Sequence, residues 1–336
     1  MIEELVGYGV RFARGEGGNF RFTREGGHSR PRILFHGDET GKEITSHLLA
    51  EARTRENCTI CEYTEILDII AGQDGCCGGV LRDIASGEIF PVYADCTLLA
   101  TGGVGGLFQN STNYRHLTGD ALGIALRRGI EVEHLDYVQI HPTTLFSSKP
   151  GRRFLISESV RGEGAVLLDK DGERFCNELM PRDVVTGDIR AQMQKDGTDH
   201  VWLDMRPVGE RTLREHFPTI FARCREEGYD PLKVPVPVVP AQHYFMGGVK
   251  VDLDGRTSMP RLFAAGETAC NGVHGKNRLA SNSLLESLIW AERAAKAMAY
   301  FDQLKTFPPI DAASYADVAA LRAEDAKNIR EEAERE

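Results

Sequence analysis

The chain has 336 residues, of which 41% are hydrophobic and 27% charged, so it has the composition of a globular protein with room for two domains. Its 50 acidic and 40 basic residues give a net charge of −10, which argues against nucleic acid or an anionic membrane as a partner. No apolar run reaches the ~18 residues of a membrane span. The first residues lack a signal peptide's basic start and apolar stretch, so we expect a cytoplasmic protein.

The first hundred residues predict a helix followed by short strands. Residues 40–55 show helical spacing, with Thr40 as the cap and Glu43 at the capping-box position. Residues 58–70 and 79–93 predict short antiparallel strands, because alternating segments are separated by turn residues.

The eight cysteines are too few for a disulfide scaffold in a chain of this length. Cys58 and Cys61 form a CxxC pair, the spacing of some zinc and redox sites. Their segment alternates like a strand, however, and residues i and i+3 of a strand point to opposite faces. We therefore expect reduced thiols here and no metal.

A buried parallel strand is predicted at Cys96–Ala100, an apolar run that ends in Thr101-Gly102-Gly103. A helix follows from about Gly119 to Arg128, and Gly129 is its predicted stop.

From His141 to His243 the sequence pattern changes to charged loops with two helical stretches, 181–195 and 209–227. This pattern predicts a separate α+β domain. Three prolines predict a stiff connection out of it: Pro235, Pro237 and Pro240. Residues 247–300 return to the alternating strand and helix pattern of an α/β domain. Residues 306–336 predict an exposed helix or a frayed tail. One domain is thus interrupted by another, in an α/β fold.

The polar stretch Gly275–Glu286 is the most informative feature of the chain. It comes after a strand-like run, Arg261–Ala265, that closes on Gly266 and Glu267, and it leads into an apolar helix. α/β enzymes present backbone amides to a cofactor in this way. Arg278 adds a cation suited to a negatively charged substrate beside a flat cofactor. No G-x-G-x-x-G fingerprint follows a strand anywhere in the chain.

Other polar candidates are scattered along the sequence. Arginines pair with carboxylates through two parallel hydrogen bonds, and histidines donate hydrogen bonds without bulk, so together they suit a small dicarboxylate. Singly, each has an ordinary interpretation as a solvated charge or a turn residue. The candidates besides Arg278 are Glu25, His28, His141, Arg161, Arg182 and His243.

Ten motifs in order resemble the succinate dehydrogenase/fumarate reductase flavoprotein family, and within it the L-aspartate oxidases, from the first residues to about Tyr300. Glu25 and the reading Ala280-Ser281 favour the oxidases, because the relatives that use succinate tend to have an apolar residue and Gly-Ala there. The motifs are REGGHS (24–29), ATGG (100–103), TGDA (118–121), QIHPT (139–143), SESVRGEGA (157–165), DGERF (171–175), PRDVV (181–185), HYFMGGV (243–249), LFAAGE (262–267) and NRLASNSLLES (277–287).

The resemblance implies roles for the substrate-side residues. Arg278 and His243 would bind one substrate carboxylate and His141 the other. Arg182 would lie between the domains, as the proton-transfer group in the fumarate direction and as a substrate ligand in the oxidase direction. Glu25 would receive the amino group of aspartate, and the carboxylate pocket would be lined by Ser157 and Glu158.

The implied cofactor is FAD, with hydride leaving the substrate Cα for the flavin and iminoaspartate as the product for quinolinate and NAD synthesis. Electrons would then pass to oxygen or fumarate, and quinolinate synthase is the expected pathway partner. The implied FAD contacts are Glu267 near the ribityl chain, Ser281, Asn282, Ser283 and Leu284 by the isoalloxazine, and Thr101, Gly102 and Asp120 along the nucleotide.

Full-length relatives begin with a βαβ unit that carries the glycine fingerprint and end in a helical domain, so we expect an incomplete Rossmann-like FAD-binding domain interrupted by a capping domain. Two other readings stay open: a fumarate reductase or succinate dehydrogenase flavoprotein subunit, and an inactive fragment that cannot hold FAD. The expected divisions are 1–138 (FAD-binding, partial), 139–245 (capping), 246–302 (FAD-binding, return) and 303–336 (linker or start of the helical region).

Overall fold

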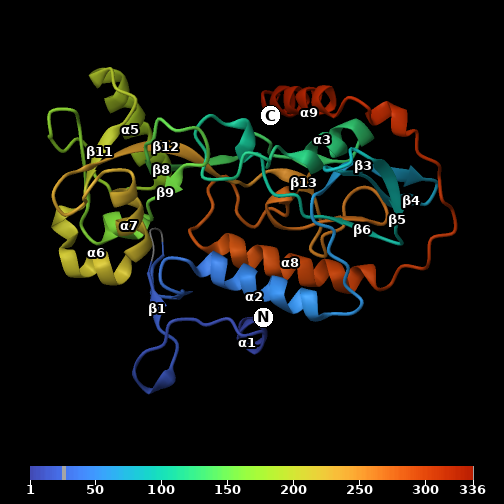
Figure 1. The fold of residues 1–336 in the computed structure, drawn as a ribbon, viewed down its shortest axis with the longest axis horizontal. Helices are drawn as coiled ribbons and strands as arrows, with labels where there is room; N and C mark the ends of the chain where they lie inside the picture. Colours follow the sequence, from blue (N-terminus) through green and yellow to red (C-terminus); the bar gives the residue numbers. More distant parts are fainter. Residues whose placement is uncertain (25–27, 336) are drawn as a thin grey trace.

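The computed structural model describes residues 1–24 and 28–335 and shows two lobes side by side (Figure 1). We call the lobe at the left of Figure 1, residues 138–245, the cap lobe, and the remainder the base lobe. The candidate site residues are divided between these two lobes, so the way the lobes meet decides the site.

The cap lobe is built on a five-stranded antiparallel sheet whose strand order is β10-β11-β12-β8-β9. Helices pack on it because each offers an apolar stripe, such as Val185 and Ile189 of α5, which are fully buried against Leu203 of the sheet. The strands are β8 (Val138–Leu145), β9 (Phe154–Leu155), β10 (Val166–Leu168), β11 (Val201–Asp204) and β12 (Val236–Phe245), and the helices are α4 (Glu158–Gly162), α5 (Arg182–Asp196), α6 (Glu210–His216) and α7 (Pro218–Glu226).

The three prolines do not form the stiff connection that their spacing predicts. Two of them lie inside β12, the central strand of the sheet. Pro237 pairs with Trp202, and its carbonyl accepts a hydrogen bond from the Phe146 amide at 2.9 Å. Pro240 falls at a register shift of the strand. A proline without an N–H is tolerated where its carbonyl alone is used or where a bulge interrupts the ladder.

The long helix predicted over residues 209–227 is two helices. Pro218 ends α6 and begins α7, because a proline has no amide to continue the first helix but suits the first position of the second. The start of α7 is bound by a residue that is far away in the sequence. The Asp38 carboxylate accepts hydrogen bonds from the amide and hydroxyl of Thr219 at 3.0 and 2.9 Å, which ties the N-terminal segment to the cap lobe.

The base lobe has the predicted strand of residues 96–100 at its centre, as β6 (Thr97–Leu99), paired in parallel with β14 (Leu262–Ala264). A second sheet joins β7 (Val132–Glu133), β13 (Gly248–Lys250) and β15 (Ala269–Cys270). The helices α3 (Asp120–Arg128) and α8 (Asn282–Met298) cover these strands, and α3 stops as predicted at Gly129, whose φ is +64°. Among the described residues no helix, including α8 with its 17 residues, is both long and apolar enough to cross a bilayer.

The antiparallel unit predicted before β6 has three strands, β3 (Thr64–Gly72), β4 (Gly75–Asp83) and β5 (Ile89–Tyr93). The strand prediction over residues 58–63 was wrong, because this segment lies outside the ladder. Cys58 and Cys61 are exposed free thiols, and the described residues contain no cluster of three potential metal-ligating side chains.

The predicted helix of residues 40–55 is present as α2 (Thr40–Thr54) but lacks the predicted capping box. Besides α1 (Ile2–Gly7) and α2, the N-terminal part has β1 (Phe22–Thr23) and β2 (Ile33–Leu34). The Thr40 hydroxyl accepts a hydrogen bond from the His36 amide, and Glu43 accepts one from the Arg11 amide at 2.9 Å. Both side chains therefore bind the incoming loops instead of forming a capping box.

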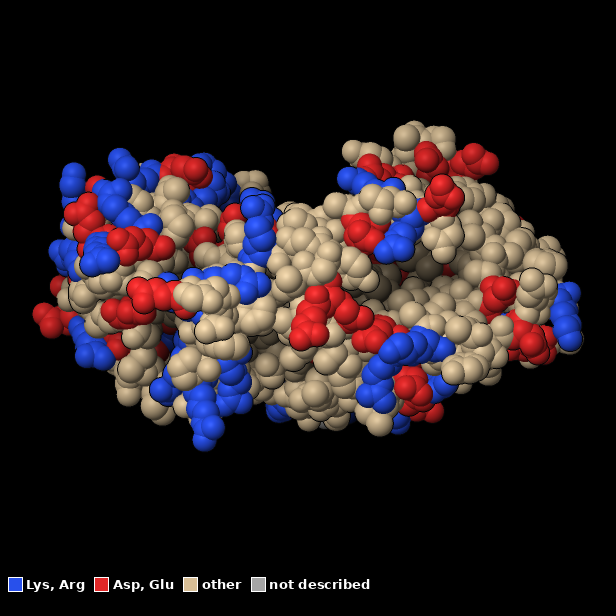
Figure 2. Space-filling model, turned by 90° about the horizontal axis from the view of Figure 1, so that it is seen from below, with Lys and Arg blue, Asp and Glu red and all other residues tan. Residues whose placement is uncertain are grey.

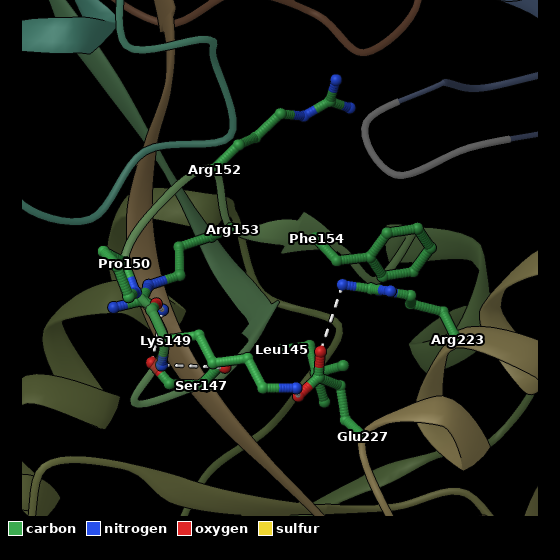
Figure 3. A pocket seen from close by; sticks show the side chains of 9 residues that line it. All are labelled: Leu145, Ser147, Lys149, Pro150, Arg152, Arg153, Phe154, Arg223 and Glu227. Atoms are coloured by element: carbon green, nitrogen blue, oxygen red, sulfur yellow. Dashed lines mark hydrogen bonds and ion pairs between the residues drawn. The ribbon is translucent and has the colours of Figure 1, made fainter.

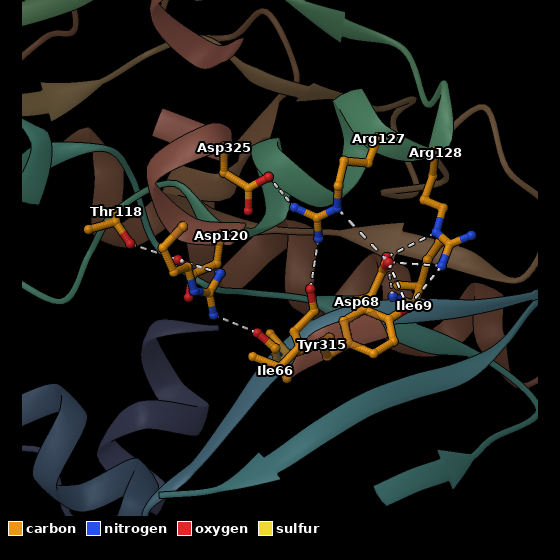
Figure 4. A network of polar contacts seen from close by, with 11 residues as sticks. Ile66, Asp68, Ile69, Thr118, Asp120, Arg127, Arg128, Tyr315 and Asp325 are labelled. Carbon is orange, nitrogen blue, oxygen red and sulfur yellow. Dashed lines mark hydrogen bonds and ion pairs between the residues drawn. The ribbon is translucent and has the colours of Figure 1, made fainter. Parts of the chain in front are cut away.

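The C-terminal segment is not a frayed tail: α9 (Val318–Ala333) packs along α3. Asp325 of α9 is buried against Gly123, where an added Cβ would lie 2.4 Å from the Asp325 carboxyl carbon, so only glycine allows this approach. Figure 4 shows the polar network around this contact, in which buried Asp68 accepts two hydrogen bonds from Arg128, at 3.0 and 2.8 Å, and one from Tyr315 at 3.0 Å. The Tyr315 hydrogen bond and the ion pair of Asp325 with Arg127 thus fasten the C-terminal segment to the rest of the base lobe.

Candidate active site

Two histidines face each other across adjacent strands of the cap lobe. His141 of β8 and His243 of β12 have ring centroids 5.3 Å apart. The Thr143 amide donates to Nδ1 of His141 at 3.2 Å, so the neutral ring carries its proton on Nε2. This Nε2 is buried with no hydrogen-bond partner among the described atoms, which leaves a donor available to a ligand.

Both histidines are held in the neutral form. Burial and then the Arg182 guanidinium keep the pKa of His141 well below its ordinary value, and burial and Arg278 do the same for His243. The Thr112 hydroxyl lies 2.9 Å from Nδ1 of His243 and fixes that ring. Neutral rings donate hydrogen bonds to a carboxylate without adding charge.

Arg182 is oriented by two neighbours at the start of α5. Its Nε donates to Glu158 at 2.6 Å, and a terminal nitrogen donates to the Gln139 side-chain oxygen at 2.9 Å. The side chains of Arg182 and Glu158 are only 11% and 15% exposed, so this ion pair is largely shielded from solvent. The guanidinium is therefore fixed close to His141, whose pKa it lowers.

Arg278 reaches the same place from the base lobe. It is 5% exposed, and its guanidinium carbon lies 4.8 Å from the Tyr244 ring centroid. The Gln139 amide nitrogen donates to the Arg278 carbonyl at 2.8 Å and to the Asn277 side chain at 2.7 Å. Gln139 thus links the Arg278 loop to Arg182, and four predicted residues from two lobes converge on one place.

Of the other predicted substrate-side residues, one acts as a helix cap in this structure and one falls outside the part of the chain that the structure describes. Ser157 begins α4, and its hydroxyl accepts from the Ser159 amide at 3.3 Å, so in this structure it positions Glu158. Glu25 lies outside the described residues. Its neighbour His28 is buried and contacts the Ala280 carbonyl through Nε2 at 2.8 Å, two residues from Arg278.

Two polar residues of the site were not assigned a role from the sequence. Gln139 is two positions before His141 on β8, and strand alternation puts both on one face, so the QIHPT motif held the signal. Arg161 is one helical turn beyond Glu158 in α4 and is 2% exposed, with Nε and one terminal nitrogen lacking partners among the described atoms. Burial lowers the pKa of Arg161, and Glu158 opposes that shift.

The base lobe also supplies a helix start beside this cluster. Ser281 precedes α8 with φ +63°, and α8 has no side-chain cap for its first amides. Leu284 and Leu285, in the first turn, are 39% and 43% exposed. A helix start without a side-chain cap, beside exposed apolar side chains, is a suitable seat for a flat ring with polar edges.

Comparisons with known proteins identify the family of the chain. A family described as an FAD binding domain matches residues 1–284. The L-aspartate oxidase of Clostridium perfringens is 49% identical over 306 residues, which are 90% of this chain and 69% of that protein. The Streptomyces coelicolor L-aspartate oxidase is 47% identical, over 89% of this chain and 53% of its own length.

The chain belongs to the L-aspartate oxidase family.

Solved structures of the wider superfamily share the fold. The chain superposes on Escherichia coli quinol-fumarate reductase chain FrdA with a TM-score of 0.80 and 30% identity, over 96% of this chain and 59% of that chain. The chain therefore spans between about half and two thirds of most of these relatives. Its fold is the FAD-binding fold of the succinate dehydrogenase/fumarate reductase flavoproteins, with mixed helices and sheets.

FAD is the cofactor of this family, and the flavin side of the site fits it. The predicted contacts Ser281, Asn282, Ser283 and Leu284 make up the uncapped start of α8. Glu267 is partly buried, and burial raises its pKa to about 7, as it does for Glu286 in α8. The Glu267 carboxylate accepts from the Phe245 amide at 2.9 Å, and the short polar loop after β14 keeps it beside Gly103.

The nucleotide side differs, because its predicted contacts already have partners within the chain. Asp120 pairs with Arg322 of α9 at 3.1 Å and accepts from the Thr118 hydroxyl at 2.8 Å. The Thr101 hydroxyl lies 2.9 Å from that of Thr268, and the Gly102 carbonyl accepts from Thr268 at 2.7 Å. The residues assigned to the nucleotide therefore already bind Thr268, Thr118 or Arg322 of α9.

Proposed function

We propose that this chain carries the dicarboxylate site of an enzyme that oxidises L-aspartate to iminoaspartate with FAD as the cofactor. The observation that carries the proposal is the convergence of Arg182, Arg278, His141 and His243, with a buried unpartnered donor on Nε2 of His141. A donor set of this kind needs a ligand with two groups of acceptor oxygens, which is what a four-carbon dicarboxylate offers.

Each group has a role that follows from its protonation state. Arg278 with His243 would bind one carboxylate, and Nε2–H of His141 the other. Glu158 and Gln139 hold the Arg182 guanidinium between them, so that it faces the bound substrate as a fixed cation. When bound, FAD supplies the acceptor for the Cα hydride. Fixing both ends of the substrate limits the directions in which its Cα–H bond can point, which favours transfer.

Selection of aspartate over succinate requires a group for the amine. The proposal assigns this role to Glu25, because a carboxylate pairs with an ammonium and gains nothing from a methylene. The electrons would pass to oxygen or fumarate, and iminoaspartate would enter quinolinate and NAD synthesis, with quinolinate synthase as the pathway partner. The proposed architecture is a Rossmann-like FAD-binding domain in two pieces, interrupted by the cap lobe.

A second candidate is a fumarate reductase or succinate dehydrogenase flavoprotein, which the 30% identity to fumarate reductase structures favours. A third is a chain that cannot hold FAD, which the engagement of Asp120 by Arg322 favours.

The test compares oxidation of aspartate and succinate by the purified chain after incubation with FAD. The proposal predicts aspartate turnover, with Glu25→Gln weakening aspartate use far more than fumarate reduction. Turnover of succinate without aspartate would establish the second candidate instead. A protein that stays colourless after incubation with FAD would establish the third.

A further inference from the structure

The turn between β8 and β9 encloses a cavity of about 140 Å³ on the cap lobe (Figure 3). Its lining includes four basic residues and one acidic residue, and the guanidinium of one of them, Arg152, points away from the others and lies 4.8 Å from the Tyr114 ring centroid. A water molecule takes up about 30 Å³ in the liquid, so this space admits a small ion with part of its hydration. The lining residues are Leu145, Ser147, Lys149, Pro150, Arg152, Arg153, Phe154, Arg223 and Glu227.

Arg153 is the central cation, and all its hydrogen bonds go to neutral oxygens. Its Nε donates to the Asn110 side chain at 2.9 Å, and one terminal nitrogen donates to the carbonyls of Ser147 and Lys149. Arg115 lies nearby and donates only to backbone carbonyls, including that of Gly151 at 3.4 Å. Within residues 1–24 and 28–335, neither arginine has a carboxylate within 4.0 Å.

This arrangement is electrostatically unfavourable as it stands. Burial and the charge of Arg115 both lower the pKa of Arg153, because no nearby anion compensates its guanidinium. A bound anion would remove that cost, so the cluster gains stability on binding one.

Two of the other cations share the Glu227 carboxylate, and one of them, Arg223, also pairs with Glu226 at 2.8 Å. Lys149 and Arg223 approach Glu227 at 3.3 and 3.1 Å, from opposite sides of the cavity (Figure 3). The lining thus has a formal surplus of positive charge in a protein whose net charge is −10. In Figure 2 the Lys and Arg side chains at the cap-lobe end are interspersed with Asp and Glu side chains, so the surplus of positive charge belongs to the cavity and not to the whole end.

We propose that this cavity is an anion site for a phosphate group, separate from the dicarboxylate site. Phosphate is the small anion best matched to clustered Arg and Lys donors, because it offers several acceptor oxygens and more than one charge. The proposal does not rest on the proposed oxidase function, since it concerns the cap lobe alone.

A single segment of the chain, Ser111-Thr112, separates the cavity from the active site. The Arg153 amide donates to the Ser111 carbonyl at 2.7 Å, and the next residue, Thr112, contacts His243. Arg278 and His141 do not line the cavity. Loss of Arg278 therefore leaves the phosphate site intact, which separates the two sites experimentally.

The test is a calorimetric titration of the full chain, without added FAD, with inorganic phosphate in buffers matched for chloride. Lys149→Gln with Arg223→Gln removes two exposed cations from the cavity without breaking the Arg153 contacts, and we expect the dissociation constant to rise at least about tenfold. Lys195→Gln with Arg211→Gln changes the charge of the cap lobe equally at exposed positions outside the cavity, and we expect less than about a twofold change.

Arg278→Gln is the second control, with phosphate binding expected to stay within about twofold of the wild type. Three results would overturn the proposal: no phosphate binding by the wild type, equal weakening by the two double variants, or loss of phosphate binding in the Arg278 variant. The last result would place the phosphate in the dicarboxylate site. Circular dichroism of each variant shows whether a loss of binding reflects loss of fold.

Discussion

The substrate side and the nucleotide side of the candidate site are built from the same chain but are satisfied differently. On the substrate side, His141 and Arg161 keep buried nitrogens without partners among the described atoms, and Arg182 is held ready by Glu158. On the nucleotide side, Asp120 is already paired with Arg322 of α9. On the substrate side the partnerless buried donors can be satisfied by an anionic ligand, whereas on the nucleotide side the Asp120 carboxylate already has a cation from the chain itself, although Arg322 and Asp325 each keep one buried atom without a hydrogen-bond partner among the described atoms.

The largest expected effect comes from removing the base-lobe cation of the substrate side. Arg278→Gln should lower kcat/KM for aspartate about a hundredfold to a thousandfold in the FAD-reconstituted protein, because a buried charged donor to the substrate is lost. Lys276→Gln is the matched control, since this lysine is exposed and pairs with Asp136. Equal losses from both substitutions would mean that the effect comes from the loop and not from a contact with the substrate.

The Asp68 network of the base lobe should show itself in stability rather than in activity. Asp68→Asn leaves Arg128 and Tyr315 facing a neutral amide in a buried place, and we expect the free energy of unfolding to fall by about 3 kcal/mol. Urea unfolding with an unchanged m-value measures this change. Glu62→Gln breaks the exposed pair with Arg53 and should cost less than about 1 kcal/mol. Similar costs for the two variants would remove the distinction between this network and surface pairs.

Because the pKa of Glu286 on the flavin side is raised, the free energy of unfolding should depend on pH. Burial puts this pKa at about 7 in the folded protein, against about 4.3 when unfolded, so the folded state binds the proton more tightly. Its contribution to stability is complete below about pH 4.3 and is lost as the pH rises through 7.

Between pH 5 and 8 the wild type should therefore lose about 2 kcal/mol more of its unfolding free energy than Glu286→Gln does. His141 and His243, whose pKa values are lowered, have the opposite effect: stability falls as acid protonates the unfolded chain below about pH 6.5. The pH dependence that the two histidines cause is the same in the wild type and in Glu286→Gln, so it cancels when the two stability curves are subtracted. Parallel stability curves for the two proteins would show that Glu286 is ionised at neutral pH.

The smallest expected effect tests the close contact of α9 with α3. Gly123→Ala puts a Cβ against the Asp325 carboxyl group, and we expect a loss of about 1–2 kcal/mol. Gly187→Ala, within α5, meets no atom within 4 Å and should stabilise by up to about 1 kcal/mol through its better helix propensity. Opposite signs in thermal unfolding are expected, and stabilisation by both substitutions would show that α9 is not held against α3.

The sequence predicted the parts of the fold that local chemistry decides. The parallel strand of residues 96–100 and the helix ended by Gly129 were confirmed, because an apolar run and a C-terminal glycine act locally. The prolines of β12 were misread, since only the tertiary register shows that Pro240 falls at an irregularity. The docking of α9 was missed for the same reason: Asp325 and Ile329 are buried by α3, two hundred residues away.

In the candidate site, too, some features could be predicted from the sequence and others could be seen only in the tertiary structure. Arg182, Arg278, His141 and His243 converge as the family resemblance implied, although their positions span more than a hundred residues. Gln139 could have been found from strand alternation. The pairing of Asp120 with Arg322 could not, because nothing in the sequence near either residue points to the other.

The most direct test of the account is a calorimetric titration of the cofactor-free chain with L-aspartate, compared with L-alanine. If two arginines and two neutral histidines form a preorganised clamp for two carboxylates, aspartate binds, Arg278→Gln abolishes that binding, and alanine, with one carboxylate, produces no saturable heat. Equal behaviour of aspartate and alanine, or binding of aspartate that survives Arg278→Gln, would contradict the dicarboxylate site.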